Sequence, residues 1–342
     1  MNMSYENALN LAYRGLQAAG IAQAAAFETA QFLVLAEADG LASHGLARVS
    51  QYAGHARHGR IDSHAKVSMK SVKTASVLVD ANDGLAFPAL RLATDVSVNL
   101  ASRHGVGLVA VKNTHHFGVA GHYTEAAARA GFISILMGNT PAAMPMAGGK
   151  KALFGTNPLA AAFPLAMKGI KNPLVIDMSL SAVARGKLLV AANKGETIPE
   201  GWALNSAGKP TTDPKEGLKG LMLPVGGDKG ALLALIIELL VVTLSGSQYS
   251  FEADTFFSAT GNKPKLGQFL LSIDIGLAGK GVYQSRIRDL IAAFSEDAGI
   301  RLPGERRFKQ RQLAFKNGLV LSDSVVNEIQ AGIASQWAVN KI

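Results

Sequence analysis

The chain has 342 residues, of which 48% are hydrophobic and 17% charged, and its formal net charge is +9. This length and composition support two or three lobes with large buried cores and exclude global disorder. Cysteine is absent, which excludes disulfides, thiolate metal sites and a cysteine nucleophile. The lack of cysteine also fits a reducing, cytoplasmic location.

The basic charge raises the question of nucleic acid. Aromatic residues make up only 6% of the chain, and no helix-turn-helix, zinc-finger or RNA-binding signature is present. We therefore expect the positive field to attract anionic substrates and phosphates, with no nucleic-acid partner. The longest apolar run, residues 231–244, is too short to span a bilayer and contains Glu238. It predicts a buried helix and no membrane partner.

Helical and strand patterns alternate along the chain, which predicts the α/β class. Residues 193–221 are rich in Gly, Pro, Thr and Lys and are predicted as a long functional loop. The predicted helices are 5–38 as a pair, 43–58 with Ser43 as N-cap, 86–104 ended by Gly105, 125–130, 231–244, 285–298 and 323–336. The predicted strands are 77–79, 106–111, 133–137, 174–176 and 268–275.

Residues 105–110 match the dinucleotide-binding pattern G-x-G-x-x-A. That pattern binds a pyrophosphate only when a strand precedes it and a helix follows. Here a helix comes first and an apolar strand follows. We therefore interpret the two glycines as the end of a helix and the start of a strand.

Three histidines, His115, His116 and His122, raise the possibility of a metal site. Zinc sites favour pairs four apart on a helix, or sets completed by Cys or carboxylates, and this spacing provides neither. No metal is expected. A histidine pair just after a strand is better placed to line a pocket.

Ser43, His44 and Arg48 form a candidate catalytic group. On a helix, His44 and Arg48 share a face because they are four residues apart. An imidazole that titrates near neutrality, beside a guanidinium that binds carboxylates, suits reduction of a 2-oxo or 2-imino acid. An interior histidine without a catalytic role is the alternative. Ser43 either hydrogen-bonds the imidazole or only caps the helix.

Three further segments have both a functional and an ordinary interpretation. Thr156 lies in a Gly-Thr-Asn-Pro turn and either faces a ligand or only closes the turn. Asp177 ends an apolar strand, where α/β proteins place ligand-contacting residues. The glycine-rich segment 226–230 precedes a helix, so its backbone N–H groups either bind an anion or only start the helix.

Eight blocks, in order along the chain, resemble the type-2 malate/L-lactate dehydrogenase superfamily, which uses NAD(P) without a Rossmann fold. Two of them, Gly226–Gly230 and Pro303–Arg307, are most similar to the branch that reduces Δ1-pyrroline-2-carboxylate or Δ1-piperideine-2-carboxylate. The blocks are Ser43–Arg48, His115–Gly118, Gly155–Pro158, Asp177–Ser179, Ile198–Trp202, Pro210–Pro214, Leu223–Gly230 and Arg301–Arg307.

The resemblance implies a role for each matching position. His44 is the implied proton donor and Ser43 its relay partner, while Arg48 and Thr156 are implied to bind the substrate. The cofactor, NADPH with NADH tolerated, is implied to contact His116, Phe117, Gly118, Val119, Ala120, Asp177, Met178, Ser179, Arg185, Gly186, Lys229, Gly304, Glu305, Arg306 and Arg307.

The resemblance also implies an architecture and a reaction. We expect a sheet flanked by helices (71–281), a helical lobe from both chain ends (1–70 with 282–342), and a homodimer. The expected reaction is reduction of a cyclic imine 2-carboxylate to L-proline or L-pipecolate. The alternative is a malate/lactate-type 2-hydroxy acid dehydrogenase, and a non-catalytic anion-binding protein is the rival from another class.

Two positions depart from the family pattern. Asn205 stands where the family usually has an acid, and Asp228 stands where related reductases often have His. Either change bears on substrate or cofactor preference. Neither removes an implied catalytic group.

Overall fold

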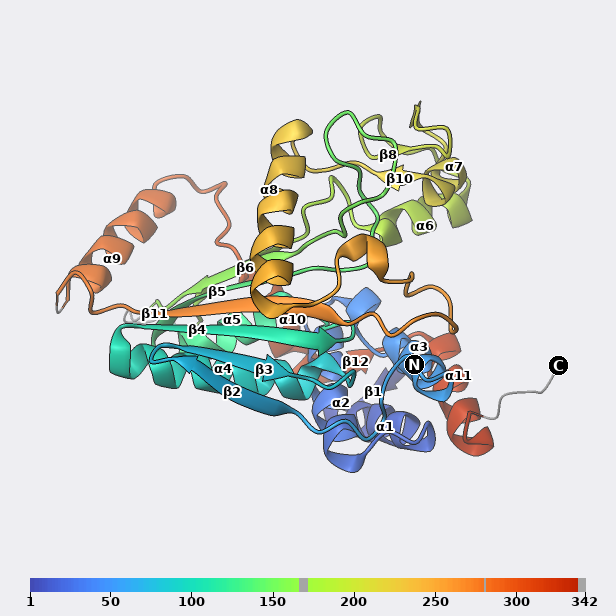
Figure 1. The fold of residues 1–342 in the computed structure, drawn as a ribbon, viewed down its shortest axis with the longest axis horizontal. Helices are drawn as coiled ribbons and strands as arrows, with labels where there is room; N and C mark the ends of the chain where they lie inside the picture. The colour runs from blue at the N-terminus through green and yellow to red at the C-terminus, as the bar shows by residue number, and fades with distance from the viewer. Residues whose placement is uncertain (166–171, 280, 338–342) are drawn as a thin grey trace.

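A seven-stranded mixed sheet forms the centre of the computed structural model, which describes residues 1–165, 172–279 and 281–337 (Figure 1). Within this sheet only β3 and β4 pair in parallel, whereas a Rossmann sheet is built of parallel strands. The predicted non-Rossmann α/β class is thus confirmed. In spatial order the strands are β2 (Ser68–Lys73), β3 (Ser76–Asp80), β4 (Val106–Thr114), β11 (Leu266–Asp274), β5 (Phe132–Gly138), β6 (Leu159–Phe163) and β7 (Leu174–Met178).

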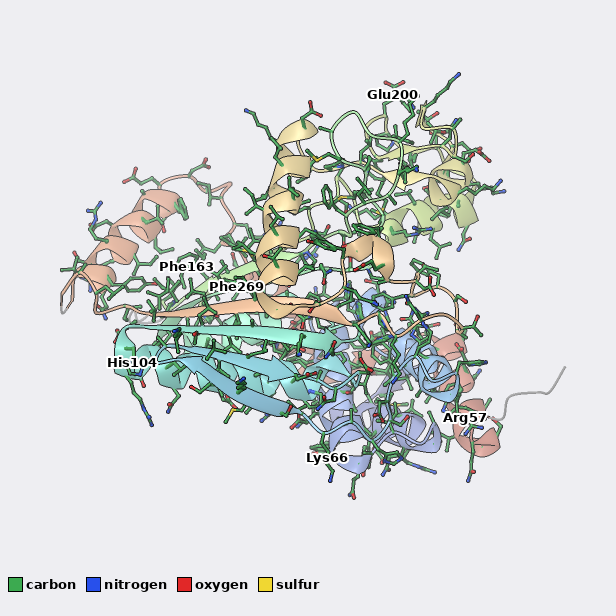
Figure 2. The ribbon with its side chains drawn as sticks, viewed as in Figure 1. Arg57, Lys66, His104, Phe163, Glu200 and Phe269 are labelled. Carbon is green, nitrogen blue, oxygen red and sulfur yellow. The ribbon has the colours of Figure 1, made fainter. Side chains whose placement is uncertain are left out.

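Helices cover both faces of the sheet. The helices α4 (Ala86–His104) and α5 (Ala120–Arg129) pack on one face, and α8 (Asp228–Glu238) packs on the other (Figure 1). Phe269 of β11 lies beneath α8 and shares its apolar cluster (Figure 2). Apolar side chains are thereby removed from water on both sides of the central strands, which is the main stabilising term of such a layered fold.

Helices from the two ends of the chain pack together beside the sheet (Figure 1). Strand β1 (Asn2–Met3) pairs with β12 (Leu319–Val320), which joins the ends directly. In contrast, Ile291 of α9 (Val282–Ser295) contacts Leu165 and Leu174. The division into residues 1–70 with 282–342 and 71–281 stays a prediction. The packed terminal helices are α1 (Tyr5–Ala18), α2 (Gln23–Ala38), α3 (Ala47–Arg57), α10 (Glu305–Asn317) and α11 (Asp323–Ser335).

The prediction of a long loop over residues 193–221 is wrong. This region contains part of α6, all of α7 and a small sheet in the order β10-β8-β9. Asn205 Oδ1 accepts the N–H groups of Ala207 and Lys209, both at 3.0 Å, and so closes the β8–β9 hairpin. The turn-forming residues separate very short elements rather than forming one loop. These elements are α6 (Arg185–Lys194), β8 (Ala203–Leu204), β9 (Pro210–Thr211), α7 (Pro214–Lys219) and β10 (Leu221–Met222).

The apolar run 231–244 is helical, but it is only partly buried. Leu232 and Ile236 are 49% and 52% exposed on the outer side of α8. The helix widens to a π-helical turn at Leu239–Thr243, directly after the buried Glu238. Helix α10 was not predicted, because its charged residues hide the helical period.

The Gly105–Gly107 segment ends α4 and begins β4, as predicted. Gly105 caps the helix in the left-handed region, at φ 81°. A Cβ at Gly107 would collide with the backbone carbonyl of Ser97 and with Leu100 in α4. The second glycine thus permits close packing of helix on strand.

Replacing Gly107 with Ala should lower the free energy of unfolding by about 2 kcal/mol, since the backbone of α4 must shift. Thermal unfolding measures this change. Gly105→Asn is the matched control, because Asn tolerates the left-handed conformation. If Gly107→Ala kept its Tm but lost NADPH binding, the dinucleotide interpretation of this segment would be correct.

Candidate active site

Ser43 and His44 lie in a short 3₁₀ turn, η1 (Ala42–His44), which precedes α3. The hydroxyl of Ser43 lies 3.0 Å from Nδ1 of His44. The predicted helix cap is wrong, because α3 begins only at Ala47 and its N-cap is Leu46. Of the two interpretations of Ser43, the structure thus favours the hydrogen bond to the imidazole.

Glu37 at the end of α2 holds this turn in place. Its carboxylate accepts the backbone N–H of Leu46 at 2.7 Å and so takes over the capping role. A Cβ at Gly45 would collide with the same carboxylate. Gly45 therefore leaves room for the Glu37 carboxylate beside η1, the candidate catalytic turn.

Arg48 reaches back to the turn from the first turn of α3. Its Nε donates to the backbone oxygen of Ser43 at 2.7 Å, and its Nη1 donates to Oε1 of Gln51 at 2.6 Å. The guanidinium and His44 thus come together through the turn, not along one helix face. The expected proximity of the His44 imidazole and the Arg48 guanidinium is thus present.

His116 stacks on His44, with ring centroids 5.6 Å apart and an angle of 30° between the planes. Its Nδ1 lies 2.6 Å from the hydroxyl of Tyr52 and also accepts the backbone N–H of Gly118 at 3.4 Å. With Nδ1 an acceptor, the neutral ring carries its proton on Nε2. His116 thus presents a hydrogen-bond donor beside the catalytic turn.

A second histidine pair, His55 and His115, lies beside this arrangement. Nδ1 of His55 lies 2.8 Å from Nε2 of His115, and Nε2 of His55 faces the backbone oxygen of Ser258 at 2.9 Å. Phe256 packs against the rings of His115 and His116, at 4.8 and 5.5 Å between centroids. His115 and His116 are buried directly after β4, and their role in lining a pocket stays a prediction.

The electrostatics of this cluster favour neutral imidazoles. Burial, followed by the nearby charge of Arg48, lowers the pKa of His44 to about 4. Burial also lowers the pKa of His115 and of His116 well below the usual value. In the free chain His44 is therefore an unprotonated base near neutral pH.

Thr156 lies in the predicted turn, where Asn157 adopts φ 33°. The N–H of Thr156 donates to the hydroxyl of Thr140 at 2.9 Å, and its carbonyl accepts the N–H of Leu180 at 2.8 Å. The amide of Asn157 donates to the buried carboxylate of Glu238 at 2.8 Å. Within the described ranges no direct contact joins Thr156 to His44 or Arg48.

Most of the residues expected to hold the cofactor lie at the N-termini of four helices, α5, α6, α8 and α10, and the others end β7. Asp177 occupies the N-terminus of α5, whereas α6, α8 and α10 have no side-chain cap in the described part of the chain. Backbone N–H groups at such ends bind phosphate. Gly186, Gly226 and Gly227 have no neighbouring atom within 4 Å of an added Cβ, so space is open there. These features fit the phosphates of a dinucleotide.

Arg185 connects α6 to the histidine cluster. Its guanidinium lies over the ring of Phe257, 4.9 Å from the centroid, and Nη2 donates to the backbone oxygen of Leu218 at 2.8 Å. Phe257 follows Phe256, which packs on His116. One segment of chain thus reaches both the expected cofactor helix and the catalytic turn.

The other predicted cofactor residues differ in their burial. Phe117, Val119 and Ala120 are buried, and Gly118 adopts φ 70° against Phe87. Lys229, Glu305 and Arg306 are exposed, and Gly304 caps α10 at φ 91°.

Met178 and Ser179 stand at the end of β7. Met178 is exposed, and Ser179 is half-buried with its hydroxyl 3.0 Å from that of Ser181. The described contacts do not bring Lys229 next to the other predicted residues.

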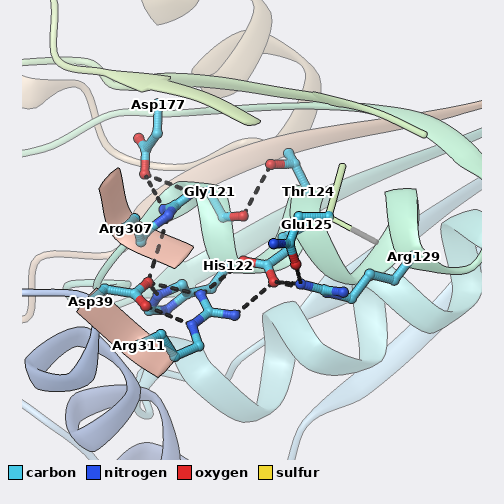
Figure 3. A network of polar contacts seen from close by, with 10 residues as sticks. Asp39, Gly121, His122, Thr124, Glu125, Arg129, Asp177, Arg307 and Arg311 are labelled. Atoms are coloured by element: carbon cyan, nitrogen blue, oxygen red, sulfur yellow. Dashed lines mark hydrogen bonds and ion pairs between the residues drawn. The ribbon is translucent and has the colours of Figure 1, made fainter. Parts of the chain in front are cut away.

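An ion network, buried around Asp39 and partly exposed at Asp177, joins Asp177 and Arg307 to the terminal helices (Figure 3). The carboxylate of Asp177 accepts the N–H of Gly121 at 2.8 Å and so occupies the N-terminus of α5. Arg307 lies between two carboxylates, 3.7 Å from Asp177 and 3.6 Å from Asp39. These two predicted residues are thus paired with each other.

Asp39 is the centre of that network. Arg311 donates to both of its carboxylate oxygens, at 2.6 and 2.8 Å, and His122 lies 2.8 Å away. Arg311 also binds Glu125, at 2.7 and 2.9 Å. These hydrogen bonds outweigh burial and hold the pKa of Asp39 and of Glu125 below their usual values. His122 therefore belongs to a structural network rather than to a metal site.

Several residues of the site were not predicted. Tyr52 and His55 follow Arg48 at helical spacing and face the same cluster. That spacing was the available signal. Gln51 follows Arg48 at the same helical spacing, whereas Phe256 carried no such signal, because its contact with Gln51 spans 205 residues of sequence.

A cavity of about 230 Å³ lies elsewhere, between the start of β7 and α10. Among the described residues no cluster of three potential metal ligands occurs. In the same ranges, every helix is too short or too polar to cross a membrane.

Comparison with known proteins identifies the family. A profile of the malate/L-lactate dehydrogenase family matches residues 3–330. The chain belongs to this family. Its predicted membership and its assignment as an oxidoreductase are thereby confirmed.

Relatives within the family act on different substrates. The (2R)-3-sulfolactate dehydrogenase (NADP(+)) of Chromohalobacter salexigens is 43% identical over 98% of both chains. The Delta(1)-pyrroline-2-carboxylate/Delta(1)-piperideine-2-carboxylate reductase of Pseudomonas putida is 35% identical over 89% of both. The crystal structure of delta1-piperideine-2-carboxylate reductase from Pseudomonas syringae pvar. tomato superposes with a TM-score of 0.91, at 32% identity, covering 97% of this chain and 99% of that one.

Asp39→Asn should lower the free energy of unfolding by about 3 kcal/mol, because it leaves Arg311 and Arg307 buried with less compensating charge. Denaturant unfolding at neutral pH measures the loss. Asp289→Asn is the matched control, since its ion pair with Arg286 is exposed and should contribute little.

The dependence of the free energy of unfolding on acid pH should also change in Asp39→Asn. A depressed carboxylate pKa stabilises the fold above the unfolded value, about 3.9 for Asp, and this stabilisation is lost as pH falls through the folded pKa. The wild type should lose stability steeply below about pH 4, and Asp39→Asn less steeply. Equal acid slopes in the two proteins would contradict the role of Asp39.

Proposed function

We propose that this chain interconverts a small 2-oxo acid and the corresponding 2-hydroxy acid with NADP(H). The observation that supports this most directly is the contact of Ser43 with Nδ1 of His44, next to a guanidinium fixed by the same turn. A proton donor and a carboxylate-binding group in one place are what reduction at C2 requires of the protein.

Each residue of the turn has a distinct role in the proposal. Nε2 of His44 gives a proton to the substrate oxygen during reduction and accepts it during oxidation. Ser43 orients the ring through Nδ1, and Arg48 binds the substrate carboxylate. Thr156 contributes a hydroxyl to the substrate. The bound nicotinamide supplies the hydride at its C4 carbon.

The helix N-termini assigned above hold the cofactor. Phosphates meet backbone N–H groups at the N-termini of α6, α8 and α10, with Arg185 and Lys229 supplying positive charge. Asp177 and Arg307 fix the relative positions of β7, α5 and α10. NADP(H) is preferred because a relative with 43% identity is named for NADP(+).

The proton on His44 depends on the substrate in this mechanism. Burial and then the charge of Arg48 lower the pKa of His44, and a carboxylate bound by Arg48 offsets the second of these effects. The bound anion therefore raises the pKa of His44 and favours the protonated form that reduction needs.

Sulfolactate and 3-sulfopyruvate are the proposed first substrates. The 43% identical relative acts on (2R)-3-sulfolactate, and a dianion suits a chain with net charge +9. Cyclic imine 2-carboxylates are the second candidate, supported by the 35% identical reductase and the structure with TM-score 0.91. Asp228 departs from those reductases and weighs against the imine. We also propose a cytoplasmic homodimer.

A substrate panel tests the proposal. Purified protein should oxidise 3-sulfolactate with NADP⁺ and should reduce Δ1-pyrroline-2-carboxylate, oxaloacetate and pyruvate more slowly with NADPH, followed by NADPH absorbance. Faster turnover of the imine would favour the second candidate. No turnover of any substrate in either direction would contradict both.

His44→Ala should lower kcat at least a hundredfold, because the proton donor is removed, while the Kd for NADPH stays within about twofold. Stopped-flow kinetics and NADPH fluorescence measure the two quantities. His104→Ala, an exposed histidine at the far end of α4 (Figure 2), is the control. Near-normal turnover of His44→Ala would overturn the assignment.

The pH dependence of reduction should show different pKa values of His44 in the free enzyme and in the substrate complex. Reduction needs protonated His44, so kcat/KM falls as pH rises above the free-enzyme pKa, about 4. The value of kcat reports the substrate complex, where the anion raises the pKa, so its decline lies at higher pH. Oxidation should show the opposite trend. Coincident profiles of kcat and kcat/KM would refute the coupling.

A further inference from the structure

The amide of Gln51 lies between the guanidinium of Arg48 and the backbone of Phe256. Its Oε1 accepts Nη1 of Arg48 at 2.6 Å, and its Nε2 donates to the carbonyl of Phe256. We propose that Gln51 is a positioning residue that aims Arg48 at the substrate carboxylate. The proposal rests on the function assigned to Arg48 above.

The orientation of this amide is determined by its two neighbours. A guanidinium offers only donors, and a backbone carbonyl only accepts. The amide satisfies both in one orientation alone, with its oxygen toward Arg48 and its nitrogen toward Phe256. A flipped amide would place donor against donor and acceptor against acceptor. Gln51 is thus a directional link between α3 and the segment around Phe256.

Arg60 makes that segment rigid. This side chain is fully buried and donates to the carbonyls of Asp254, Thr255 and Ser258, at 2.9, 2.9 and 2.6 Å. A fourth bond, from Nε, reaches the carbonyl of Asn262 at 3.0 Å. The carbonyl that holds Gln51 therefore belongs to a backbone segment fixed on both sides.

The consequence for Arg48 is a fixed guanidinium plane. Ser43 accepts from Nε on one side and Gln51 accepts from Nη1 on the other. Nη2 has no hydrogen-bond partner among the described residues and is left for the substrate. A long side chain that is fixed in advance loses less conformational entropy when it binds a carboxylate. Gln51 should thus affect substrate binding more than the proton transfer at His44.

Four variants of the full chain test this. Gln51→Met keeps the length and removes both hydrogen bonds, and Gln51→Glu keeps the acceptor but adds a carboxylate that competes for Arg48. Arg48→Met removes the guanidinium. Ser50→Ala is the matched control on the same helix, because the Ser50 hydroxyl has no hydrogen-bond partner in the described ranges. Readouts are KM and kcat for 3-sulfolactate, Kd for oxalate by calorimetry, and Kd for NADPH.

We expect Gln51→Met to raise KM and the oxalate Kd about tenfold, with kcat and the NADPH Kd within twofold. Gln51→Glu should raise KM further, and Ser50→Ala should match the wild type. Unchanged KM and oxalate Kd in both Gln51 variants, with Arg48→Met defective, would overturn the positioning role and leave the proposed function intact. An Arg48→Met variant with normal KM and oxalate Kd would overturn both.

Discussion

The buried carboxylate of Asp39 is the interaction on which the arrangement of the molecule depends. It stands at the end of α2 and binds Arg311 of α10 and His122 of α5. A carboxylate in the interior is costly unless donors surround it, so these elements are held in one relative position. Through Arg307 the same network reaches Asp177, which accepts from the start of α5. Helices from both ends of the chain are thereby fixed against the sheet that carries the expected cofactor residues.

Much of the fold could be predicted, because its larger elements have clear periods and terminators. Helix α4 and its end at Gly105 are confirmed, since a left-handed glycine is a strong local signal. The residues of the candidate catalytic turn were predicted, but its 3₁₀ conformation was not. A serine followed by an apolar helix resembles an N-cap, while the actual cap comes from Glu37, in a preceding helix. The small sheet around Asn205 was missed because two-residue strands have no measurable period.

The parts of the site that could not be predicted are those made by long-range contacts. His44 and Arg48 share a motif, but the stacking of His116 on His44 depends on how β4 meets α3. The contact of Gln51 with Phe256 depends on a segment 205 residues away. Sequence spacing indicates which residue types are available, and only tertiary packing decides which of them face each other.

In the described structure no carboxylate hydrogen-bonds to His44, because the nearby carboxylate of Glu37 binds the backbone of Leu46 instead. The imidazole of His44 faces Arg48 and His116. Many catalytic histidines gain their proton affinity from a neighbouring carboxylate, and here Ser43 provides only a neutral hydroxyl. In the proposed mechanism the anion that completes the site is the substrate itself. Under that proposal His44 gains its proton when a carboxylate is bound to Arg48, which couples substrate recognition to proton transfer without any change of fold.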